Sequence, residues 1–203
     1  FGWHIPDALN AAPWGVDDPG IVNLPSVILV VLCGLLLIRG ASESAIVNTV
    51  MVLIKLGVLL LFAAVCLTAF TSSHFTPFMP EGMAGVTSAA AVIFFTFIGL
   101  DAVSTAGDEV RNPQQAMPRA IIGALLVVTG IYLLTAVASI GAQAWTDFDP
   151  DDSASLSVLA NSVTGSTWVG TIIAAGAVIS IFSVTLVVIY GQTRILFAMG
   201  RDG

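Results

Sequence analysis

Lys55 is the residue most able to do chemistry in a sequence that is otherwise strongly apolar. It lies in the middle of the run IVNTVMVLIKLGVLLLF, residues 46–62. A lysine at the centre of a membrane helix costs about 2.5–3.5 kcal/mol on insertion scales, so it normally faces a protein partner or a wet cavity. Because an amine in such a place can lose and regain a proton, Lys55 is predicted to be functional. The structural alternative is an ammonium held permanently by backbone carbonyls of a neighbouring helix.

A second departure is the run AAAVIFFTFIGLDAVSTAGDEV, residues 89–110, in which Gly99 stands between Thr96 and Asp101. Glycine costs about 1 kcal/mol relative to alanine inside a helix. Beside a hydroxyl and a carboxylate, it indicates a helix break that exposes backbone carbonyls to a cavity, as in many secondary transporters. Gly99 could equally serve close helix packing. Asp101 could bind a cation, cap a helix or pair within the bundle.

Hydroxyl and thiol groups in the other apolar runs give weaker signals. Ser180 and Ser183 share one helix face, but such hydroxyls usually bond a carbonyl of the preceding turn. Cys33 and Cys66 lie inside apolar runs and predict neither a disulfide nor a metal site. The sequence contains no metalloprotease, nucleophile-elbow or phosphate-loop motif. We therefore expect a protein that is not an enzyme and that needs no metal or cofactor.

The composition of the 203 residues excludes whole classes of protein. Hydrophobic residues make up 57% and charged residues 9%, with a mean hydropathy of +0.98. A soluble globular domain carries about 25% charged residues. A net charge of −7 with six Lys and Arg residues excludes an electrostatic nucleic-acid binder, which needs a basic face. The solvent of this chain is therefore expected to be the lipid bilayer.

Five apolar stretches approach or exceed the about 20 residues that a helix needs to cross a bilayer. They predict an all-α integral membrane protein with a single transmembrane region. The sequence begins in a loop-like stretch without an initial Met, so we expect it to be part of a longer protein. The expected spans are residues 22–38, 46–70, 88–106, 120–142 and 169–197.

The charges near the ends of these stretches predict the orientation of the chain. Basic residues occur between the first and second spans, between the third and fourth, and at the end of the fifth, whereas the other loops carry acidic residues and no Lys or Arg. By the positive-inside bias, the N-terminus lies outside and the C-terminus is cytoplasmic. The basic residues are Arg39, Arg111, Arg119, Arg194 and Arg201.

Three strings make the sequence similar to a known family: GASESAIVNTVMVLIKL, FFTFIGLDAVSTAGDEVRNPQQAMP and GQTRILFAMGRDG. In order and spacing they resemble amino-acid permeases of the amino acid–polyamine–organocation (APC) superfamily, most nearly the cationic amino acid transporters and their bacterial relatives. The resemblance covers essentially the whole chain. It implies the twelve-helix leucine-transporter fold of two inverted five-helix repeats, in which the present spans are similar to helices four to eight.

The same resemblance implies that the third span is a discontinuous helix and that it carries an amino-acid site. A break at Gly99 would expose carbonyls that hold the substrate amino group, those of Phe95, Thr96 and Ile98. Leu100 would point into the pocket. Many relatives carry Phe in place of Leu100, and Thr96 often aligns with Ala, so the side-chain preference stays open.

The resemblance also implies a role for Lys55. The matching lysine of proton-coupled relatives occupies the position of a bound sodium ion in sodium-coupled members, here next to Ser180 or Ser183. This implies a secondary active transporter of the cell membrane that couples an amino acid to a proton, with the lipid bilayer as its surroundings. An amino acid or polyamine exchanger, and a receptor or structural membrane protein without transport, are the alternatives.

Overall fold

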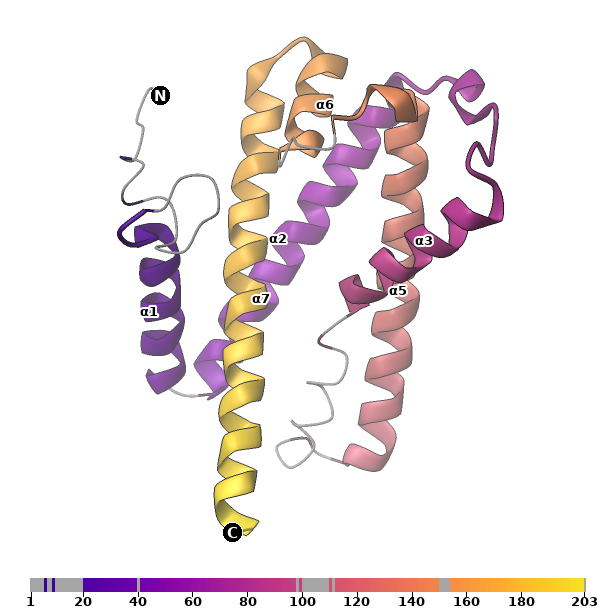
Figure 1. Cartoon of the computed structure of the whole chain (residues 1–203). Helices are drawn as coiled ribbons and strands as arrows, with labels where there is room; N and C mark the ends of the chain where they lie inside the picture. The colour runs from indigo at the N-terminus through magenta and orange to yellow at the C-terminus, as the bar shows by residue number, and fades with distance from the viewer. Residues whose placement is uncertain are drawn as a thin grey trace.

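The computed structural model describes residues 6, 9, 20–39, 41–97, 99, 110, 112–149 and 154–202, without the side chains of residues 41–44 and 202. Within these residues every regular element is a helix (Figure 1), so the all-α prediction is confirmed. The α-helices are α1 (Leu24–Arg39), α2 (Ala41–Thr68), α3 (Gly82–Phe94), α5 (Pro113–Ala142), α6 (Ser155–Thr164) and α7 (Thr167–Asp202). Short 3₁₀ helices are η2 (Ser72–Phe75), η3 (Phe95–Phe97) and η5 (Trp145–Asp147).

Three helices in the described part of the chain are long and apolar enough to cross a membrane: Ala45–Thr68 within α2, Pro113–Ala142, and Thr167–Arg201 within α7. The helix α1 and the segment Gly82–Phe97 are apolar but shorter. Large apolar side chains point outward from these helices, as suits a surface that meets lipid rather than water. That all five stretches cross the membrane stays a prediction.

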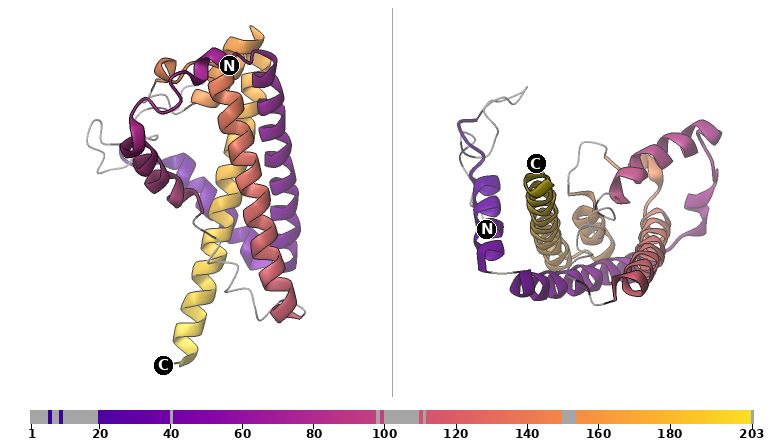
Figure 2. Two further views of the ribbon diagram at one scale, coloured as in Figure 1. Left: turned by 90° about the vertical axis from the view of Figure 1, so that its right-hand side faces the viewer. Right: turned by 90° about the horizontal axis from the view of Figure 1, so that it is seen from below.

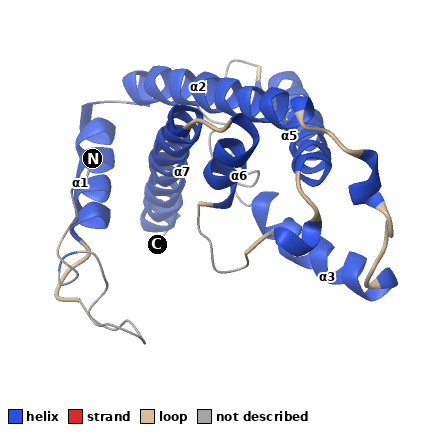
Figure 3. Cartoon of the chain, turned by 90° about the horizontal axis from the view of Figure 1, so that it is seen from above, coloured by secondary structure: helices blue, strands red, loops and turns tan. Residues whose placement is uncertain are grey.

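Helix α2 is the element around which the others are arranged. It packs against α5 and α7, while α6 packs against α7 and α2, and α1 packs against α7. The end-on views of Figure 2 and Figure 3 show α7, α6 and α5 along one side of α2, with α3 on the same side but farther away.

The buried core lies at the end of the bundle that α6 covers. Its eight side chains come from α2, α5, α6 and α7, and small residues among them let the helices approach closely. Nearer the middle, the backbone at Gly176 of α7 approaches the side chain of Val58 on α2, so the contact between these two helices is tight. The core residues are Phe62, Ala63, Cys66, Ala138, Leu159, Ala160, Val169 and Ile173.

The helix bounds differ in part from the expected spans. Helix α5 begins at Pro113, before the expected start near residue 120, because proline suits the first position of a helix. Helix α3 also begins earlier than expected, at Gly82, and α7 extends beyond both ends of the expected span. The short helix α6 is not expected from the sequence. It is held to α7 by the Asn161 side chain, whose Oδ1 accepts from the Gly170 backbone N–H over 2.9 Å.

Candidate functional site

Lys55 and Ser183 lie side by side where α2 meets α7. Lys55 Nζ donates to Ser183 Oγ over 3.4 Å, and Ser183 Oγ donates to Asn48 Oδ1 over 2.6 Å. Asn48 stands about two helical turns before Lys55 on α2, so both residues lie on the same face of that helix. Ser183 is only 1% exposed. The three polar side chains form a hydrogen-bonded row inside an otherwise apolar helix contact.

The two serines singled out from the sequence have different partners. Ser183 bonds across to α2, whereas the Ser180 hydroxyl donates to the Gly176 carbonyl oxygen of its own helix over 2.8 Å. Ser180 lines a cavity that Lys55 also lines. Ser183 is thus the serine bonded to Lys55, and Ser180 follows the usual pattern of a hydroxyl in a membrane helix.

The α-helical turns of α3 stop short of Gly99. They end at Phe94, the chain continues as a 3₁₀ helix through Phe97, and Gly99 has a φ of +109°. This φ lies in a region that glycine adopts readily and other residues do not. A right-handed helix therefore does not continue through Gly99.

The other residues implied to bind substrate surround the turn at Gly99 or lie outside the described residues. Thr96, whose backbone carbonyl is implied to bind substrate, lines the neighbouring cavity, and its hydroxyl donates to the Ile93 carbonyl oxygen over 2.6 Å. Phe95 is 67% exposed and is not among the lining residues of the neighbouring cavity. Outside the described residues lie Ile98, Leu100 and Asp101.

Tyr132 of α5 is a site residue that the sequence analysis did not identify. Its hydroxyl donates to the Thr96 carbonyl oxygen over 3.5 Å, and its ring packs edge-on against Phe97 with centroids 5.7 Å apart. A tyrosine in the middle of a membrane helix carries a hydroxyl that needs a partner. This need was the signal in the sequence that could have pointed to Tyr132.

A cavity of about 310 Å³ joins Lys55 to the turn at Gly99. Asn48, Lys55 and Ser183 contribute to its polar side, and η3 with Gly99 borders it from α3. Its volume lies at the lower end of the about 300–1,000 Å³ of small-molecule sites. The remaining wall is mainly aliphatic and includes Val52, Leu125, Val128, Val184, Val187 and Val188.

A second cavity, of about 650 Å³, also borders Lys55. It lies between α2, α6 and α7 and has Ser155, Ser157 and Ser180 among its lining residues. Lys55 thus borders both cavities. Among the described residues that line the two cavities there is no carboxylate.

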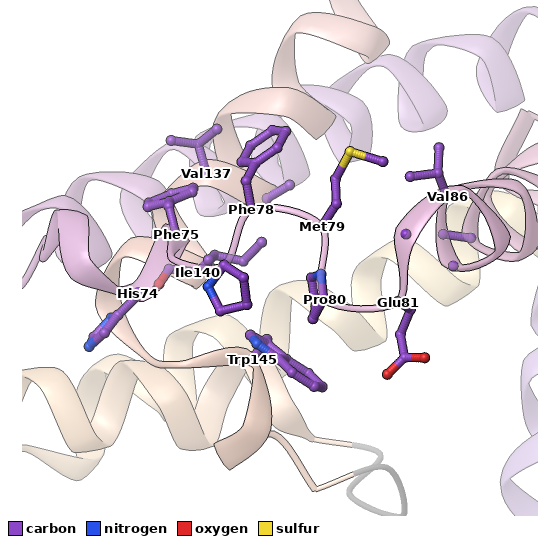
Figure 4. Close-up of a pocket in the computed structure, with 15 residues that line it drawn as sticks. His74, Phe75, Phe78, Met79, Pro80, Glu81, Val86, Val137, Ile140 and Trp145 are labelled. Atoms are coloured by element: carbon purple, nitrogen blue, oxygen red, sulfur yellow. Dashed lines mark hydrogen bonds between the residues drawn. The ribbon is translucent and has the colours of Figure 1, made fainter.

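A third cavity, of about 470 Å³, lies between the segment joining η2 to α3 and the end of α5 (Figure 4). His74 lies at its edge, with Nδ1 within 3.2 Å of the carbonyl oxygens of Ile140 and Gly141 in the last turn of α5. Trp145 and Glu81 also border it. Because it shares no lining residue with the cavities at Lys55, we do not assign it to the candidate site.

The arrangement at Lys55 suits a small molecule that has a polar and an apolar part. The ammonium, the Ser183 hydroxyl and the Asn48 amide face one side of the cavity, and η3 and Gly99, where the helix α3 has ended, border it. Sites of this kind, at helix breaks beside a charged group, bind substrates and coupling ions in secondary transporters. The Lys55 amine can in addition hold or release a proton at Nζ.

Comparisons with known proteins point to the same class of molecule. Residues 8–203 match the model of a family described as Amino acid permease. The chain is 43% identical over 204 residues to the Branched-chain amino acid permease BcaP of Bacillus subtilis, a match that covers 100% of this chain and 43% of that protein. It is 39% identical over 203 residues to the Methylthioribose transporter of the same organism, with the same coverage.

A plant relative is also similar. The chain is 34% identical over 184 residues to the Cationic amino acid transporter 9, chloroplastic, of Arabidopsis thaliana. This match covers 90% of this chain and 32% of that protein. The chain therefore spans less than half the length of these relatives. The family match over nearly all residues, together with the long apolar helices, makes this a multi-pass membrane protein. The chain belongs to the amino acid permease family of the APC superfamily.

Proposed function

We propose that the protein containing this chain is a secondary active transporter that carries an amino acid across the cell membrane together with a proton. The observation that carries the proposal is the cavity at which the Lys55–Ser183 pair meets the turn at Gly99. The relatives are named as permeases and transporters, which supports transport rather than catalysis. The positive-inside bias supports an N-terminus outside and a C-terminus in the cytoplasm.

In this proposal the two sides of the cavity have different tasks. As the resemblance implies, the backbone carbonyls of Phe95, Thr96 and Ile98 hold the substrate amino group, and of these residues Thr96 lines the cavity. Leu100 contributes to the pocket for the side chain. Lys55 carries the coupling proton at Nζ, with Ser183 as its hydrogen-bond partner. Ser180 lines the neighbouring cavity together with Lys55, and its hydroxyl bonds its own helix.

The substrate class we infer is a neutral amino acid with a branched aliphatic side chain. The aliphatic wall of the cavity supports this, because it would bury such a side chain and stabilise it through the hydrophobic effect. The name of the relative at 43% identity, a branched-chain amino acid permease, agrees with this class.

The test is uptake by the full-length parent protein in proteoliposomes. Labelled branched-chain, small neutral and cationic amino acids, together with methylthioribose, are offered with and without an inward proton gradient. Uptake of the branched-chain group that rises with the gradient is the expected result. Uptake that ignores the gradient but is driven by substrate on the opposite side would replace symport by exchange. Uptake of methylthioribose alone would overturn the amino-acid class.

A further inference from the structure

We propose that Asn48 is a positioning residue for Lys55, whose amide keeps the row Lys55–Ser183–Asn48 hydrogen-bonded in both charge states of the lysine. The inference rests on the proposed coupling of transport to protonation of Lys55. It extends that proposal because Asn48, which reaches Lys55 through Ser183, would influence the charge state of the lysine.

The first observation is the unusual partner of Ser183. The hydroxyls of Ser180 and Thr185, on either side of it in α7, donate to carbonyl oxygens of the preceding turn over 2.8 and 2.9 Å. Ser183 donates instead to Asn48 Oδ1 on α2, over 2.6 Å, and is buried. Asn48 therefore draws the Ser183 hydroxyl away from its own helix and towards Lys55.

The direction of the hydrogen bonds follows from the charge on Lys55. An ammonium has three N–H donors and no acceptor, so Ser183 Oγ must accept from Nζ. The single hydroxyl hydrogen of Ser183 then needs an acceptor, which Asn48 Oδ1 provides. In the charged state both bonds of the row are satisfied.

The same row can reverse when Lys55 is neutral. The ammonium gives one proton to a water molecule, leaving an amine with a lone pair at Nζ and a hydronium ion. The Ser183 hydroxyl can then donate to Nζ, which leaves Ser183 Oγ as an acceptor that a third group can satisfy. A rotated Asn48 amide does this through Nδ2–H, since an amide carries both an acceptor and donors. An aspartate could not donate, and an alanine could do neither.

The groups that face Lys55 from the other helices do not provide this reversal. Helix α7 contributes the hydroxyls of Ser180 and Ser183, and α6 contributes those of Ser155 and Ser157. Among the described residues that line either cavity, the titratable group besides Lys55 is Tyr132 of α5, which bonds the Thr96 carbonyl oxygen. The amide that reaches Ser183 is that of Asn48.

The test compares Asn48→Asp with Asn48→Ala in the full-length protein in proteoliposomes, with branched-chain amino acid uptake measured against external pH. Asn48→Asp holds Ser183 in the orientation that accepts from the ammonium and adds a negative charge. In Asn48→Asp the pH of half-maximal uptake should rise by about one unit or more. Stimulation of uptake by the inward proton gradient should fall, while exchange of labelled for unlabelled substrate persists. Asn48→Ala frees the Ser183 hydrogen to point at Nζ, so the midpoint should move to lower pH.

Two further variants separate this role from a general effect on folding. Asn161→Asp makes the same chemical change at an asparagine of α6 and keeps its accepted bond from Gly170, so its midpoint should equal that of the wild type. Asn48→Gln keeps both amide groups and should lie closer to the wild type than the other two Asn48 variants. If Asn48→Asp fails to fold, the other two variants still test the role of Asn48. The pH of half-maximal uptake should then be lower in Asn48→Ala and return towards the wild-type value in Asn48→Gln.

The failures of the two proposals are distinguishable. A wild-type protein whose uptake does not depend on pH or on the gradient would overturn proton coupling itself. A wild type with a clear pH dependence, shared unchanged by Asn48→Ala and Asn48→Asp, would overturn the role of Asn48 alone. The role of Asn48 would also be contradicted if the pH midpoints of Asn48→Ala and Asn48→Asp moved in the same direction. Such a result would indicate a general loss of packing, because the two variants favour opposite charge states of Lys55.

Discussion

The Tyr132 hydroxyl of α5 and the Thr96 carbonyl oxygen of η3 lie 3.5 Å apart, so the end of α3 is tied to a helix 36 residues farther along the chain. The edge-on contact between the Tyr132 and Phe97 rings supports the same junction. Because α3 otherwise stands away from α2, this junction fixes where the turn at Gly99 lies relative to Lys55.

We therefore predict that Tyr132→Phe weakens substrate binding without preventing folding. The variant keeps the ring contact with Phe97 but removes one long hydrogen bond, worth about 0.5–1.5 kcal/mol. The apparent KM for uptake should rise by roughly two- to tenfold. Tyr132→Ala, which also removes the ring, should have a larger effect. A KM equal to that of the wild type in Tyr132→Phe would show that the hydroxyl does not position the turn.

Lys55→Ala tests the coupling step. The variant removes the only group of the row that can carry the proton, so uptake should no longer respond to an inward proton gradient, whereas substrate counterflow should remain detectable. Thr49→Val is the matched control on the same helix, because the Thr49 hydroxyl donates to the Ala45 carbonyl oxygen of its own helix. Gradient-driven uptake that survives in Lys55→Ala would contradict the proposed role of the lysine.

Much of the fold could be predicted from the sequence because lipid imposes long apolar helices on it. The runs that contain Lys55 and Ser183 are helices, and the structure places these two residues in contact. The turn at Gly99 could be anticipated because glycine beside polar residues in an apolar run is costly to keep helical. Helix α6 could not, because its ten residues are too few to give a membrane-length signal.

The partners of the remaining site residues could not be predicted, because they depend on how the helices are rotated and shifted against one another. Asn48 and Tyr132 are polar residues in apolar runs, as Ser180 is, and nothing in their spacing says which of them faces a partner. The choice is made by the packing of α2 on α7 and of α5 near η3. Ser183 bonds Asn48 rather than its own helix because that packing brings the amide within 2.6 Å.

Gly99→Ala should abolish most transport while the protein still folds and reaches the membrane. At a φ of +109°, a side chain costs on the order of 1–3 kcal/mol, which the chain would relieve by changing the turn. Uptake should fall about tenfold or more. Gly123→Ala is the control, since it lies inside α5 and an added Cβ meets no atom within 4 Å. Wild-type uptake in Gly99→Ala would show that this backbone geometry is not needed for binding.

Gly176→Ala should destabilise the protein by loosening the contact that brings α7 to α2. An added Cβ would lie 2.7 Å from Val58 Cγ1, and a β-branched side chain inside a helix has little freedom to move away. Overpacking of this kind costs about 1–3 kcal/mol. The thermal unfolding midpoint of the purified protein in detergent should therefore fall, although alanine by itself favours a helix over glycine.

The double variant Gly176→Ala with Val58→Ala makes this prediction specific. Removing the two Val58 methyl groups opens the space that the new Cβ needs, so the double variant should be more stable than the sum of the two single changes predicts. Because Val58 lies one turn from Lys55 and Gly176 lies two turns from Ser183, Gly176→Ala should also reduce gradient-driven uptake, and the second change should restore part of it. Strictly additive effects on both stability and uptake would mean that this contact does not set the separation of Lys55 and Ser183.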